Sequence, residues 1–285
     1  VTRVDAVVQS HVNSGDPAFP FPQFLDYGPD RKSLASHNAP GVTHAEMEKR
    51  MLDAWQHICN NTKLQGYDVD GVQYLIPDAS VSEDHCSCAE GDGYYLLPAA
   101  IMGDKTYFDG YYMSMHDRMF IGVDRFVDGG TNIYDGYSKN LNGAGSNRSG
   151  SAMTIGNYAA ADGSATDGDV DIALALLVAA KQWGEHSGIT TRFGELNYKE
   201  EALKYIRAMV DTVPYANSNY TTYVSGVVGF DGYLKSGSHQ SQLTNWSTNG
   251  GGTPYKGMTT EHGGGQDVYF DYSAPAYFNE YRKFL

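Results

Sequence analysis

The fold is decided by residues 165–183, which read Ala-Thr-Asp-Gly-Asp-Val-Asp-Ile-Ala-Leu-Ala-Leu-Leu-Val-Ala-Ala-Lys-Gln-Trp. Their second part predicts a helix over 170–183 that ends at Gly184, because its apolar residues recur at three- and four-residue spacing. Three carboxylates precede that helix within five residues, at Asp167, Asp169 and Asp171. A helix N-terminus accommodates about two such charges, so the third indicates a further role. Calcium binding is one alternative, although the EF-hand series of ligands is incomplete.

Helical patterns recur on both sides of this stretch. Apolar spacing predicts a helix of about 18 residues from Thr43 or His44. Further helices are predicted over 94–102, 105–120, 198–213 and 273–284, with a short one near 4–12 and a β-hairpin over 67–77. Gly-, Ser- and Asn-rich segments at 128–167 and 215–266 are typical of loops that border binding sites. The sequence therefore predicts an all-α toroid or bundle, formed as a single domain over 1–285.

Composition excludes several classes of protein. The chain has 285 residues, 41% of them hydrophobic, and 34 acidic against 20 basic side chains give a formal charge of −14. Such a charge repels nucleic acid and anionic membranes. No apolar run is long enough to cross a bilayer, and no signal peptide is found at Val1. With only Cys59, Cys86 and Cys88, the chain is no disulfide scaffold, and we expect neither a metal nor a cofactor.

Aromatic residues are abundant, and tyrosine dominates them. There are 22 Tyr, 11 Phe and 3 Trp residues. A tyrosine combines a flat apolar face with a hydroxyl, which suits the apolar faces and hydroxyl edges of sugars. The other interpretation is a core rich in tyrosine, and composition does not decide between them.

Acidic residues at helix starts are candidates for glycoside hydrolysis. Inversion needs one protonated carboxyl and one carboxylate roughly 6.5–9.5 Å apart. Glu90 precedes Gly-Asp-Gly-Tyr at the start of a strongly apolar helical hairpin, where burial would raise its pKa and retain its proton. The alternative is that Glu90 and Asp92 only stabilise the helix N-terminus.

Two segments resemble a known family. Residues 165–183 are similar to the signature of glycoside hydrolase family 8 over all nineteen positions. The segment Ala-Glu-Gly-Asp-Gly-Tyr at 89–94, followed by Phe-Asp-Gly from Phe108, is similar to the segment of the family that carries its catalytic acid. The resemblance covers about residues 85–285.

The resemblance implies an (α/α)6 barrel and a secreted bacterial enzyme. Its activity would be inverting, endo-acting cleavage of a neutral or cationic polysaccharide: β-1,4-glucan, mixed-linkage glucan, xylan or chitosan. By this resemblance Glu90 is the general acid and Asp167 grips and distorts the sugar ring at the cleavage point. Asp169 and Asp171 then serve the helix start. Tyr94 and Trp246 are the candidates for stacking on sugar rings.

The general base departs from the family pattern. Many members have it in a late Tyr-Asp-Ala-x-Arg run, and this sequence has no such run. One explanation is that the C-terminal helices and the base are missing here or belong to a second polypeptide. The other is that Asp271 is the base, with Glu261 as a weaker candidate. A carbohydrate-binding protein that kept the barrel without catalysis is the alternative function, and a calcium-stabilised structural toroid is a third.

Overall fold

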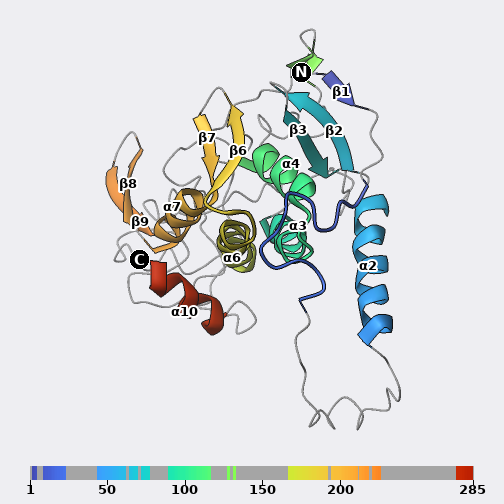
Figure 1. The fold of residues 1–285 in the computed structure, drawn as a ribbon. Helices are drawn as coiled ribbons and strands as arrows, with labels where there is room; N and C mark the ends of the chain where they lie inside the picture. Colours follow the sequence, from blue (N-terminus) through green and yellow to red (C-terminus); the bar gives the residue numbers. More distant parts are fainter. Residues whose placement is uncertain are drawn as a thin grey trace.

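A computed structural model describes most of the predicted helices (Figure 1). The described residues are 2–4, 9–23, 44–61, 64–69, 72–77, 89–116, 127–128, 131–132, 166–191, 194–210, 212–217, 220–225 and 274–284. Helices predominate among them: α2 (His44–Asn61), α3 (Ala89–Ile101), α4 (Lys105–Met115), α6 (Thr166–Trp183), α7 (Tyr198–Val210) and α10 (Pro275–Phe284). The strands are β1 (Thr2–Val4), β2 (Leu64–Val69), β3 (Val72–Pro77), β4 (Val127–Asp128), β5 (Thr131–Asn132), β6 (His186–Thr191), β7 (Gly194–Asn197), β8 (Thr212–Asn217) and β9 (Tyr220–Ser225).

Helices α3 and α6 lie against each other and run in the same direction. Near their first turns, Gly93 of α3 meets Gly168 of α6. Near their last turns, the side-chain amide of Gln182 in α6 donates a hydrogen bond to the carbonyl of Ala100 in α3 at 3.0 Å. The N-termini of the two helices therefore lie at the same end of the molecule.

Helices α4 and α7 form a second layer, and each runs antiparallel to the helix before it. The turn between α3 and α4 is tight: Gly103 has φ +67°, which favours glycine, and the Asp104 side chain caps α4 by accepting from the backbone N–H of Tyr107 at 3.0 Å. In the second layer, Phe108 of α4 packs edge-on against Tyr198 of α7. Two successive helical hairpins thus stand side by side.

Helix α10 packs against α6. Its Tyr281 hydroxyl donates to the carbonyl of Val170 in the first part of α6. At the far end of both helices, the ammonium of Lys181 lies 6.0 Å from the centre of the Phe284 ring. Side chains of α10 thus contact both the first part and the last turn of α6. This layering agrees with the predicted helix-rich fold, while closure into a six-hairpin barrel stays a prediction.

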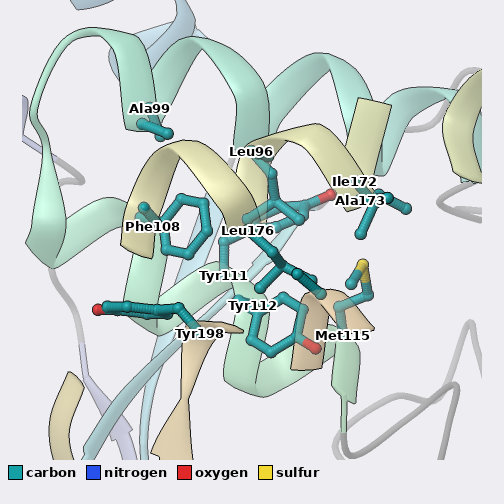
Figure 2. Close-up of a cluster of buried hydrophobic side chains, with 14 of the residues drawn as sticks. Leu96, Ala99, Phe108, Tyr111, Tyr112, Met115, Ile172, Ala173, Leu176 and Tyr198 are labelled. Carbon is teal, nitrogen blue, oxygen red and sulfur yellow. The ribbon is translucent and has the colours of Figure 1, made fainter. Parts of the chain in front are cut away.

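The core fills the space between the two layers (Figure 2). Leucine and alanine from α3 and α6 face large aromatic rings from α4 and α7. The labelled members are Leu96, Ala99, Phe108, Tyr111, Tyr112, Met115, Ile172, Ala173, Leu176 and Tyr198. Burial of so many large side chains is the main force that holds the helices at fixed distances.

Small antiparallel sheets surround the helices. The hairpin predicted over 67–77 is confirmed and extends to Leu64; β1 joins it to give the order β1-β2-β3, with Tyr67 opposite Tyr74. The pairs β4-β5, β6-β7 and β8-β9 are separate. The predicted all-α class is thus correct for the main layers but misses these hairpins, which fall partly in segments that we predicted as loops.

Two helix predictions need correction. The predicted short helix near 4–12 is wrong where it is described, because Val4 lies in β1 and residues 9–12 form no helix. The helix predicted over 198–213 ends at Val210, and β8 takes up Val213 and Pro214. A β-branched run before a proline favours extended backbone, and this preference outweighed the helical spacing. The other described helices agree with prediction within a few residues at each end.

Candidate active site at the first turns of two parallel helices

The first turns of α3 and α6 are in unusually close contact. A Cβ atom placed on Gly93 would stand 2.7 Å from the Cβ of Asp171 and 3.1 Å from the carbonyl oxygen of Gly168. Carbon atoms in van der Waals contact are normally about 3.5–4.0 Å apart. Only glycine therefore permits α3 to approach α6 this closely.

This contact brings together the two main candidates from the sequence. Glu90 lies in α3 three residues before Gly93, on the same face of the helix by helical periodicity. Asp167 directly precedes Gly168 in the first turn of α6. Both candidates thus lie within about one turn of the point where the helices meet. The side chain of Glu90 is outside the described residues.

Asp167 is half-buried, and its carboxylate is held locally. Its Oδ1 accepts from the backbone N–H of Gly168 at 2.8 Å. The N-terminal ends of α3 and α6 both point to this end of the molecule, and their partial positive charges favour carboxylates there. A cluster of acidic side chains is thereby tolerated at one end of the helix layer.

Asp171 is a site residue that the sequence interpretation assigned only to the helix start. It lies one turn after Asp167 on α6, and its Cβ is the atom closest to Gly93. Burial raises the pKa of the Asp171 carboxyl, and a hydrogen bond with Tyr277 of α10 lowers it in part. The four-residue spacing from Asp167 is the signal that could have placed both on one helix face. The partner in α10 could not have been predicted from spacing.

Asp92 and Asp169 are fully buried rather than exposed at the helix starts. Asp92 Oδ1 accepts from the hydroxyl of Tyr111 in α4 at 2.6 Å, and Asp169 Oδ1 accepts from the hydroxyl of Tyr205 in α7 at 2.9 Å. Our expectation that Asp169 simply serves the helix start is therefore incomplete, since its carboxylate also bonds to a neighbouring helix.

Further tyrosine–carboxylate pairs lie between the same helices. The Tyr198 hydroxyl donates to Asp109, which also pairs with Lys105. The Tyr112 hydroxyl donates to Glu201 at 3.0 Å. Burial raises the pKa of both phenols, and the neighbouring carboxylates raise it further. Of the two interpretations of the high tyrosine content, the core interpretation holds for these residues.

Tyr94 is the described tyrosine that fits the sugar-stacking interpretation. It follows Gly93 on α3 and is 58% exposed, although its neighbours along the helix are largely buried. Exposed aromatic rings are the kind of surface on which sugar rings stack. Its role as a stacking platform stays a prediction.

Several predicted site residues lie outside the described part of the chain. These are Asp271, Trp246 and Glu261, together with Cys86 and Cys88. Within the described ranges, no group of three or more His, Cys, Asp or Glu residues is arranged to hold a metal ion. None of the helices in those ranges is long and apolar enough to cross a membrane.

Comparisons with known proteins point to glycoside hydrolases. No family model matches the chain. It is 28% identical over 204 residues to a beta-glucanase from Niallia circulans, covering 69% of this chain and 40% of the relative. It is 30% identical over 188 residues to endoglucanase A from Acetivibrio thermocellus, covering 64% of this chain and 30% of the relative. The chain thus spans about a third of the length of these relatives.

The chain also has partial similarity to solved structures. A reducing-end-xylose releasing exo-oligoxylanase matches 60% of this chain and 38% of its own, with 23% identity and a TM-score of 0.37. Rex8A from Paenibacillus barcinonensis, in a structure with xylose, matches 60% of this chain and 38% of its own, with 20% identity and a TM-score of 0.37.

Proposed function

We propose that this chain forms part of an inverting glycoside hydrolase of family 8 type that cleaves a β-glucan or a xylan. The observation that carries the proposal is the close contact of α3 and α6 at Gly93, which brings the turns of Glu90 and Asp167 together. The sequence similarity to glucanases supports the same reaction class. Chitosan stays compatible with the net charge of −14, which attracts a cationic polymer.

Each candidate has a distinct role in this mechanism. Glu90 donates a proton to the glycosidic oxygen as the bond breaks, which requires a carboxyl that is protonated at working pH. Asp167 accepts hydrogen bonds from hydroxyls of the same sugar ring and favours its distortion towards the oxocarbenium shape. Tyr94, exposed one residue after Gly93, offers a face to a neighbouring sugar unit.

The general base completes the reaction by activating a water molecule on the opposite face of the ring. Asp271 is the proposed base within this chain, with Glu261 as the second candidate. Asp271 precedes by four positions helix α10, whose Tyr277 hydrogen-bonds to Asp171 beside the site. The alternative is that the base lies in a further helical segment or a second polypeptide, since the chain spans only part of its relatives.

The test is release of reducing ends from carboxymethylcellulose, mixed-linkage glucan, xylan and chitosan. Glu90→Gln removes the proton donor with little change of shape, and we expect it to abolish cleavage while affinity for the polymer is kept. Glu200→Gln is the matched control, because Glu200 is an exposed acid in the first turn of another helix, α7. Full activity of Glu90→Gln would exclude Glu90 as the acid.

Two further readouts separate the alternatives. Proton NMR of the first product distinguishes inversion from retention at the anomeric carbon, and retention would contradict the proposed mechanism. Binding of a polysaccharide by the unmodified chain without any release of reducing ends would instead favour a carbohydrate-binding protein.

A further inference from the structure

The two proposed catalytic turns share one local arrangement. In each, the candidate side chain stands two residues before a buried aspartate: Glu90 before Asp92, and Asp167 before Asp169. Both aspartates have 0% of their surface exposed. The same spacing and the same burial at the first turns of two different helices indicate a shared purpose.

The partners of the two aspartates also correspond. Asp92 accepts from Tyr111 at 2.6 Å and Asp169 accepts from Tyr205 at 2.9 Å. Each tyrosine comes from the next helix along the chain, α4 after α3 and α7 after α6. In both hairpins the bond joins the first turn of the earlier helix, α3 or α6, to the second half of the following helix, α4 or α7. Both tyrosines are themselves buried, with 0% of their surface exposed.

Such a bond fixes what is normally the weakest part of a helix. The first turn lacks intrahelical partners for its N–H groups and opens more readily than the middle. A buried carboxylate is favourable only where donors reach it, and a hydrogen bond to a charged group is stronger than one between neutral groups. Holding Asp92 or Asp169 therefore holds the turn that carries the residue two positions earlier.

We propose that Asp92 and Asp169 are positioning residues, which fix the turns of Glu90 and Asp167 through buried hydrogen bonds from Tyr111 and Tyr205. This inference rests on the proposed function, because it gives the two turns a catalytic purpose. It goes further because it gives a positioning role to the two aspartates and the two tyrosines, which act through the turns and not by contact with the substrate.

The experiment removes single hydroxyls in the full chain: Tyr111→Phe and Tyr205→Phe. A misplacement of about 1 Å costs on the order of a hundredfold in rate, so we expect kcat to fall ten- to a hundredfold while KM changes little. Tyr198→Phe is the matched control, since it removes the bond to Asp109 near the other end of the helices. It should lower the melting temperature without lowering kcat. Equal kcat for all three variants would overturn the proposal.

Hydrogen exchange gives a readout that does not need activity. Tyr111→Phe should speed amide exchange in residues 90–94, Tyr205→Phe should speed it in 167–171, and Tyr198→Phe should change neither segment. If the unmodified chain neither cleaves nor binds a polysaccharide, the proposed function fails, yet this measurement still decides whether the bonds fix the turns. Unchanged exchange in both segments would overturn the inference.

A second pair of variants covers the case in which the phenylalanine variants do not fold. Asp92→Asn and Asp169→Asn keep the size and a carbonyl acceptor but remove the charge that strengthens the bond. Each should fold and show faster exchange confined to its own first turn. Exchange rates equal to those of the unmodified chain would count against positioning.

Discussion

The contact at Gly93 yields a quantitative prediction for Gly93→Ala. The new methyl would stand 2.7 Å from Asp171 Cβ, about 1 Å closer than carbon atoms normally approach, and 3.1 Å from the Gly168 carbonyl oxygen. Both neighbours are fixed to the backbone of α6, so no side-chain rotation relieves the clash. The helices must separate by several tenths of an ångström or more.

Two opposing effects set the change in stability. Overpacking costs about 1–3 kcal/mol, whereas alanine is favoured over glycine inside a helix by about 0.5–1 kcal/mol. We therefore expect a net loss of about 0–2.5 kcal/mol in the free energy of unfolding. The separation of the turns of Glu90 and Asp167 should lower kcat by about ten- to a hundredfold, since a misplacement of about 1 Å costs on the order of a hundredfold.

The assay combines urea unfolding with reducing-sugar release at a temperature where the variant is folded. Gly110→Ala is the control, because its new methyl would meet the Gln73 carbonyl oxygen of β3 at 2.5 Å, away from α6. It should be destabilised yet keep most of its kcat. A Gly93→Ala variant that is more stable by the full helix-propensity gain and fully active would refute the close contact.

Three further predictions concern buried groups. Asp104→Ala should lower the free energy of unfolding by about 2–4 kcal/mol in urea titrations, because Asp104 caps α4 and accepts from Trp55 at 3.1 Å and from the backbone of His11 at 2.7 Å; a loss below 1 kcal/mol would contradict this. Because the Asp171 pKa is raised in the fold, its contribution to the free energy of unfolding is most favourable below the ordinary carboxyl pKa of 3.8. That contribution is lost as pH rises through the raised pKa. Asp171→Asn should therefore improve the melting temperature more at pH 7 than at pH 4, and an equal shift at both would argue against it. Burial raises the pKa of the Cys59 thiol to about 12, so at pH 8 roughly one part in ten thousand is thiolate. In a variant that carries Cys86→Ser and Cys88→Ser, a thiol reagent should therefore react with Cys59 only on unfolding. Rapid reaction of the native chain would disprove this prediction.

The sequence predicted the helical layers well, because apolar spacing depends on burial of one helix face. Residues 170–183 fall within α6, and residues 94–101 of the helix predicted over 94–102 fall within α3, where leucine and alanine fill the core. The small hairpins were largely missed. Short strands such as β6 and β8 have weak alternation, so no periodicity distinguished them from loops, although each pairs with the next strand along the chain.

The candidate site was predictable in part. The acidic motifs around Glu90 and Asp167 were visible, and the structure brings their turns together. Spacing alone could not show which residues of different helices meet. Asp92 and Asp169 bond to tyrosines of other helices, and Tyr277 of α10 reaches Asp171. These contacts arise from the packing of layers, which a single helical period does not encode.

The buried phenols also give this protein an optical signal of its own unfolding. Burial raises the pKa of Tyr112, Tyr198 and Tyr281 above the usual value of 10, so these rings stay uncharged in the fold while an unfolded chain would ionise. The free energy of unfolding therefore falls as the pH rises above about 10. Ultraviolet absorbance of tyrosinate should rise for these rings in one cooperative step, when the helical layers separate, rather than ring by ring.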